Sequence, residues 1–112
     1  MEELAKERAE APEPEPVSHE GITYAAVPWG RARGLNQNGG YIAAINERTG
    51  DEEWLLKVYD VSYDPEMEDD KQDVFITRLS LEKQGKALRV ENERGRVFLV
   101  SLKDRSVRPL LS

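Results

Sequence analysis

The chain has 112 residues and a net charge of −6, and it contains no cysteine and one histidine. This length allows one domain with a single hydrophobic core. The absence of cysteine excludes disulfide bonds, thiolate nucleophiles and cysteine-bound zinc. The histidine, His19, lies in a proline-rich stretch, so a Ser-His triad or a histidine metal site would depend on one residue of a linker.

No apolar run approaches the ~20 residues that a membrane-spanning helix needs. The amino terminus begins Met1-Glu2-Glu3-Leu4, which lacks the apolar region of a secretory signal. We therefore expect a cytoplasmic protein that does not bind membranes; a signal removed from a longer precursor is the alternative.

The first twenty residues offer almost nothing to bury. Prolines at positions 12, 14 and 16 alternate with Glu13 and Glu15, which favours an extended, solvated chain. We predict a disordered, acidic, Pro/Glu-rich tail over residues 1–20 and a single all-β domain over residues 21–112. Residues 1–70 carry 17 acidic and 6 basic side chains, whereas residues 71–112 carry 5 acidic and 10 basic ones. This asymmetry allows self-association between copies or pairing within one copy.

After residue 20 the apolar residues follow the period of strands, and no segment has the period of a helix. The predicted strands cover residues 22–27, 41–46, 53–61, 73–81, 87–92, 96–102 and, as an edge limited by Pro109, 106–111. The strand over 53–61 is apolar on both faces, so we expect it inside the sheet, with Trp54 in the core. The strand over 96–102 is expected near the sheet centre. The predicted fold is an antiparallel meander of six or seven strands, either an open sheet or a small barrel.

Residues Gly40–Trp54 follow a motif of glycine, apolar strand, Asn46, Thr49-Gly50 and tryptophan. This stretch resembles one repeat of a quinoprotein-type (PQQ-like) β-propeller, and Phe75–Val107 shows a weaker similarity. The resemblance implies a sheet like a propeller blade, in which Thr-Gly and tryptophan lock neighbouring blades. A propeller needs at least four blades of roughly forty residues, so this chain is too short for a closed monomer. No residue matches a cofactor ligand, and no cofactor is expected.

The loop between the third and fourth predicted strands is acidic. Its oxygens suit a hard cation such as calcium, and the candidate ligands are Asp64, Glu66, Glu68 and Asp70. An EF-hand loop that started at Asp64 would need glycine at its sixth position, where this chain has Asp69. We therefore expect no metal, and interpret the segment as a solvated loop; a calcium-binding β domain is an alternative.

The loop over residues 29–40 is the best candidate for a binding site. It is long and combines tryptophan, arginine and amide side chains, which anchor protein interfaces. The predicted contact residues are Trp29, Arg31, Arg33, Asn36, Gln37 and Asn38. The alternative is a structural loop, in which Trp29 closes one end of the core and the arginines pair with local carboxylates. We predict a non-enzymatic interaction or accessory module that binds a protein partner or a second copy of itself. A small hydrolase built on two carboxylates ranks last, because no pair is distinguished from the rest.

The same loop also suits single-stranded nucleic acid, since bases stack on aromatic rings and guanidinium groups bind phosphates. A basic stripe could then continue through Arg89, Arg94, Arg96, Arg105 and Arg108. The acidic total charge argues against this alternative, because phosphate attraction dominates such binding.

Overall fold

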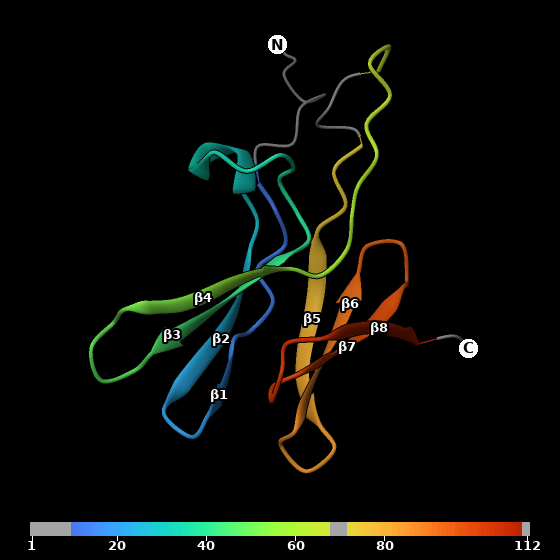
Figure 1. Cartoon of the computed structure of the whole chain (residues 1–112). Coiled ribbons are helices and arrows are strands. Elements are labelled where there is room, and N and C mark those ends of the chain that lie inside the picture. The colour runs from blue at the N-terminus through green and yellow to red at the C-terminus, as the bar shows by residue number, and fades with distance from the viewer. Residues whose placement is uncertain (1–9, 68–71, 111–112) are drawn as a thin grey trace.

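A computed structural model describes residues 10–67 and 72–110 (Figure 1). In this part of the chain, eight strands form two four-stranded antiparallel sheets, and there is no α-helix. Sheet A contains β1 (Val17–His19), β2 (Ile22–Val27), β3 (Tyr41–Asn46) and β4 (Glu52–Lys57). Sheet B contains β5 (Ile76–Glu82), β6 (Ala87–Asn92), β7 (Val97–Ser101) and β8 (Val107–Leu110). The all-β, antiparallel prediction is confirmed. The single meander of six or seven strands is wrong, and both sheets are open, so the barrel alternative is wrong as well.

Each sheet is a meander in which strands consecutive in sequence are neighbours. Asparagine makes two of the turns: Asn46 Oδ1 accepts hydrogen bonds from the backbone N–H groups of Arg48 (2.9 Å) and Thr49 (3.1 Å). Asn92 does the same for Arg94 (2.9 Å) and Arg96 (3.1 Å). Asparagine favours such turns because its side chain bonds backbone two to four residues ahead, leaving the strands free to pair.

Two strand predictions need correction. Residues 17–19 were expected in the disordered tail, but they form β1, because a left-handed turn at Glu20 (φ 53°) and Gly21 (φ 83°) folds them back onto β2. The strand predicted over 53–61 ends at Lys57, and β4 is an edge strand of sheet A rather than an internal one. The backbone then leaves the sheet as a long connection over residues 58–75, which contains Pro65 and crosses to sheet B (Figure 1).

The core lies between the inner faces of the two sheets. Ile42 on β3 is fully buried, as are Leu88 and Val90 on β6 and Val100 on β7. The remaining inner residues alternate along the strands, as the two-residue period of a pleated sheet requires. The prediction that Trp54 belongs to the core is confirmed: it packs against this cluster, and its ring centroid lies 5.9 Å from that of Tyr24. The predicted central position of β7, between β6 and β8, is confirmed too.

Over residues 10–67 and 72–110, no helix has the length and hydropathy required to cross a membrane.

Candidate functional site

The loop over residues 29–40 is a closed, hydrogen-bonded structure. It begins with a short 3-10 helix, η2 (Gly30–Arg33), which ends at Gly34 in the left-handed conformation (φ 86°). The Gly34 N–H donates to Arg31 O (3.0 Å), and the Gly30 N–H reaches across the loop to Asn38 O (3.0 Å). The loop therefore holds its side chains in fixed positions.

Three of the predicted contact residues lie at the exposed end of this loop. Trp29 is 37% exposed and meets Phe75 edge-on, with ring centroids 5.3 Å apart. The Arg31 guanidinium lies 4.4 Å from the centre of the Tyr63 ring. Arg33 pairs with Glu52 on β4, and its Nη2 atom donates to both carboxylate oxygens (2.9 and 2.8 Å). Each side chain is thus engaged with another part of the chain.

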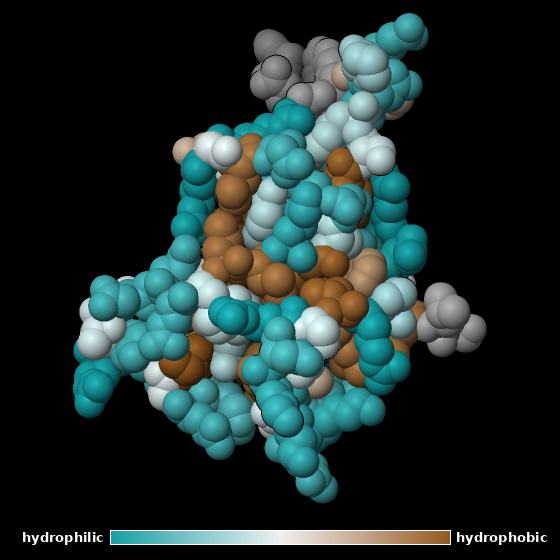
Figure 2. All heavy atoms as spheres, in the orientation of Figure 1, coloured by the Kyte–Doolittle hydropathy of each residue, from teal (hydrophilic) through white to brown (hydrophobic). Residues whose placement is uncertain are grey.

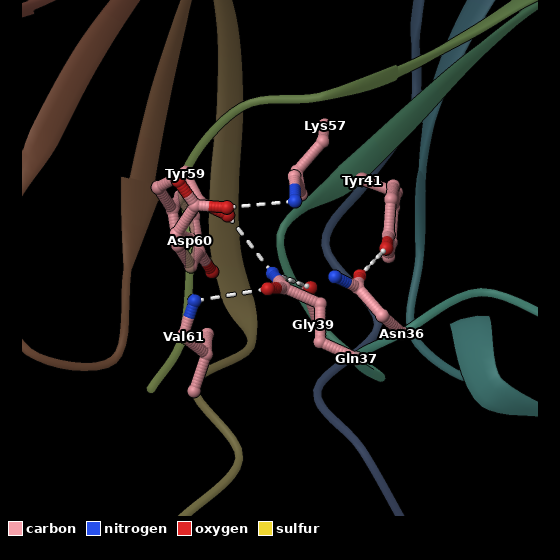
Figure 3. A network of polar contacts seen from close by, with 8 residues as sticks. All are labelled: Asn36, Gln37, Gly39, Tyr41, Lys57, Tyr59, Asp60 and Val61. Carbon is pink, nitrogen blue, oxygen red and sulfur yellow. Dashed lines mark hydrogen bonds and ion pairs between the residues drawn. The ribbon is translucent and has the colours of Figure 1, made fainter. Parts of the chain in front are cut away.

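Gln37 is the predicted contact residue that differs most from expectation. It is only 2% exposed, and all of its amide atoms are used within the chain. Nε2 donates to Gly39 O and Tyr59 O (both 2.8 Å), and Oε1 accepts from the Val61 N–H (2.9 Å) (Figure 3). The Gln37 side chain therefore hydrogen-bonds the backbone of residues 59–61 as a neighbouring strand would.

Two glycines let this segment approach so closely. Gly40 has φ 94°, and a Cβ atom there would lie 2.8 Å from Gln37 Nε2. A Cβ atom on Gly39 would lie 2.3 Å from the carbonyl oxygen of Val74. Only glycine fits where backbones meet at such distances.

Asn36 and Asn38 complete the loop. The Asn36 Oδ1 atom accepts from the Tyr41 hydroxyl (2.9 Å), and Asn38 Nδ2 donates to Asp73 Oδ2 (3.1 Å). The other oxygen of Asp73 accepts from the Tyr63 hydroxyl (2.6 Å). The structure thus gathers the predicted residues at one place, where Gln37 and Asn38 bind the long connection to sheet A.

Burial changes the titration of the two tyrosines in this connection. Desolvation is the largest cause, and the hydrogen bond to Asp73 the next, of a rise in the pKa of Tyr63 to about 12. Desolvation also raises the pKa of Tyr59, whose hydroxyl donates to Val74 O (2.6 Å).

This gives a prediction for alkaline pH. A tyrosine with a raised pKa in the folded state stabilises the fold below its unfolded pKa of about 10, and this stabilisation is lost as pH rises through the folded pKa. We expect the free energy of unfolding to fall between pH 10 and about 12. Urea unfolding at several pH values checks this, with Tyr59→Phe and Tyr63→Phe as variants. The decline should be shallower in both variants, and an identical decline in wild type and variants would contradict the assignment.

Opposite Gln37, the connection forms one wall of a groove of about 500 Å³. The other wall is β8, and the β6–β7 turn closes one end. The residues that line the groove are Val58, Tyr59, Asp60, Val61, Ser62, Val74, Asn92, Arg94, Arg96, Phe98, Val107 and Pro109. Hydrophobic side chains gather in the middle of this face of the molecule, between the two sheets (Figure 2).

Charge in the groove is unevenly distributed. The carboxylate of Asp60 pairs with Lys57 (2.7 Å) at one side, whereas Arg94 and Arg96 bring two guanidinium groups to the turn. Tyr59 stacks on Phe98 with centroids 5.3 Å apart, and the Arg96 guanidinium lies 5.8 Å from the centre of the Phe98 ring. The groove therefore combines an apolar, aromatic floor with a positively charged end.

Of the four candidate metal ligands, Asp64 is used in a turn with the backbone of Glu66, and two fall outside the described residues. Asp64 Oδ1 accepts from the Glu66 N–H (2.9 Å) in a turn. Glu68 and Asp70 lie outside the described residues. Within the part of the chain that the structure describes, no three histidine or carboxylate side chains are grouped so that they could hold a metal ion.

The basic stripe predicted for nucleic acid is divided. Arg94 and Arg96 lie in the groove, Arg105 lies 5.6 Å from the centre of the Trp54 ring, and Arg108 lines a separate depression. Arg89 pairs with Glu82 (3.7 Å) and with Glu91. These arginines do not form one continuous surface.

The groove itself was missed by the sequence analysis. Its walls come from segments some fifty residues apart in the chain, and the buried Gln37 side chain hydrogen-bonds one of them, the 58–62 segment. The local signal was Arg94-Gly95-Arg96 beside an apolar strand, which by itself indicates only a hairpin turn.

Comparisons with protein-family models, with curated proteins and with solved structures find no match to this chain. The resemblance of Gly40–Trp54 to a quinoprotein blade therefore stays a prediction.

Proposed function

We propose that this protein is a non-enzymatic protein-interaction module whose groove binds an extended segment of a partner protein. The observation that carries the proposal is the groove of about 500 Å³ between the 58–62 segment and the edge strand β8. One side of β8 pairs with β7, and in the described chain its other side pairs with no strand. Such an edge can hydrogen-bond an added strand at every residue except Pro109, which has no N–H to donate, while neighbouring apolar pockets select the side chains of that strand.

The charges in the groove favour a partner segment with acidic side chains. Arg94 and Arg96 both line the groove at the β6–β7 turn, and both residues are exposed. Guanidinium groups bind carboxylates in bidentate geometry, which fixes the register of a bound segment as well as adding affinity. Phe98, Val107 and Pro109 then offer apolar contacts along the floor.

A displayed library of random twelve-residue peptides tests this function. The full chain should enrich peptides with apolar and acidic residues. The double variant Arg94→Glu/Arg96→Glu should bind them about tenfold more weakly, because it reverses the charge at the end of the groove. The matched control is Arg78→Glu/Lys103→Glu, which changes the net charge equally at exposed positions outside the groove.

Amide chemical shifts report whether both double variants keep the fold. Equal binding by the two variants, or no enrichment of peptides by the folded wild-type chain, would contradict the proposal.

A further inference from the structure

A second depression, of about 240 Å³, lies on the outer face of sheet B. Its residues are Lys83, Lys86, Ala87, Leu99, Ser101, Ser106 and Arg108. Ala87 and Leu99 form an apolar floor and are 7% and 5% exposed, respectively. Because Leu99 and Phe98 are consecutive residues of β7, they face opposite sides of the sheet. The depression and the groove are therefore separate sites.

Three cations and no carboxylate line this depression. In the described chain, neither Lys83, Lys86 nor Arg108 forms an ion pair. Arg89 lies on the same face but differs from these three residues, because its charge is paired with two glutamates. Like charges held close together repel one another, and an anion bound between them relieves that repulsion.

The two hairpin turns beside this depression are tied to each other. Lys83 (φ 57°) and Gln84 (φ 58°) are left-handed in the β5–β6 turn, a conformation that residues other than glycine seldom adopt. The Leu102 N–H, just after β7, donates to Lys86 O (3.0 Å) and ties this turn to the β7–β8 turn. Lys83 and Lys86 thus lie on a turn that is fixed relative to the β7–β8 turn, and Arg108 lies on β8, which follows that second turn.

One carboxylate lies beside the two serines. The Asp104 carboxylate accepts from the Ser106 N–H (3.0 Å), and this bond, with those to the Ser106 and Ser101 hydroxyls, holds the pKa of Asp104 below its usual range. Asp104 is therefore ionised at neutral pH and partly offsets the three cations. Its removal should strengthen any anion site here.

We propose that this depression binds a phosphate monoester. A phosphate monoester carries close to two negative charges and three acceptor oxygens. It therefore suits a depression lined by three cations better than a single carboxylate does. The apolar floor of Ala87 and Leu99 lies where the organic part of the ester would sit. The volume is slightly below the range of ordinary small-molecule pockets, about 300 Å³ and more, so the ligand is small.

Titration of the full-length, isotope-labelled chain tests this proposal. The probes are inorganic phosphate and phosphoserine, with sodium chloride at matched ionic strength as the reference. We expect saturable shifts of the amide signals of Ala87, Leu99, Ser101 and Ser106 with phosphoserine. Saturation by phosphoserine at lower concentration than by inorganic phosphate assigns the site to an organic ester. Equal affinity for both probes overturns the ester and leaves a site for free phosphate.

Matched variants complete the test. Lys86→Gln and Arg108→Gln should each weaken phosphoserine binding about fivefold or more, and Asp104→Asn should strengthen it. Arg78→Gln is the control, because it removes an exposed charge of sheet B outside the depression. Shifts that chloride reproduces, or that Lys86→Gln and Arg108→Gln leave unchanged, would overturn the proposal. The groove proposal would survive that result, since none of these side chains lines the groove.

Discussion

Replacing Gln37 with leucine is expected to lower the free energy of unfolding by about 3 kcal/mol. Leucine is close to glutamine in size but cannot hydrogen-bond. The carbonyls of Gly39 and Tyr59 and the N–H of Val61 then lose their amide partner beside a buried side chain. Each buried polar group left without a partner costs ~1–3 kcal/mol, and partial access of water reduces the total. Urea unfolding at pH 7, followed by circular dichroism, measures the change.

Asn36→Ala is the matched control. Asn36 neighbours Gln37, but it is exposed, and its Oδ1 atom accepts a single hydrogen bond, from Tyr41. Its substitution should cost less than about 1 kcal/mol. If Gln37→Leu were no more destabilising than Asn36→Ala, the hydrogen bonds of Gln37 would not be what holds the groove wall in place.

The second large effect is expected at Phe75, where alanine should lower the free energy of unfolding by about 4 kcal/mol. Phe75 is 1% exposed and is among the largest fully buried side chains. Its removal loses the transfer free energy of the ring and leaves a cavity, which together cost ~3–5 kcal/mol for phenylalanine. The cavity would lie beneath Trp29, whose ring meets that of Phe75 edge-on. Chemical denaturation with tryptophan fluorescence measures the loss.

Trp29→Ala tests whether that stability depends on the buried ring rather than on the aromatic pair. Trp29 is 37% exposed, so less of its surface is removed from water, and its loss should cost clearly less than that of Phe75. Equal losses for the two variants would assign the energy to the ring pair itself. Circular dichroism follows this comparison, because the substitution removes one of the two tryptophans and so changes the fluorescence signal itself.

Stability and binding are coupled at the groove. Its wall over residues 58–62 belongs to no strand, and its hydrogen bonds run to Gln37 and Gly40. If those bonds are lost, the wall should open locally before the two sheets unfold. We therefore expect Gln37→Leu to weaken peptide binding even under conditions where the chain remains folded.

Local signals in the sequence predicted the hairpins well. Asn46 and Gly50 bend the chain between β3 and β4, and Asn92 and Gly95 do so between β6 and β7. These turns depend on the side chain and backbone preference of a few consecutive residues, so a sequence reveals them. The β1–β2 turn was missed although Gly21 marks it, because residues 17–19 were assigned to the tail and no strand was expected before the turn.

The prediction for residues 53–61 shows where sequence patterns mislead. Apolar residues on both faces indicated an internal strand, yet β4 is an edge strand. Val58 enters the core after the strand has ended, and Tyr59 packs against Phe98 of the other sheet. Apolar residues on both faces of a segment indicate that it is buried. They do not indicate whether a second sheet covers it or whether it lies between two strands of its own sheet.

The sequence by itself determined that this protein is built of antiparallel strands, where most of its hairpins turn, and that Trp54 faces the core. These features follow from backbone preference and from the two-residue period of apolar side chains. Only the tertiary structure decided that the strands divide into two sheets, that Gln37 is buried, and that the arginines lie on different surfaces. Those outcomes depend on which distant segments pack together. Each such contact joins residues that are far apart in the chain, so no local sequence pattern indicates it.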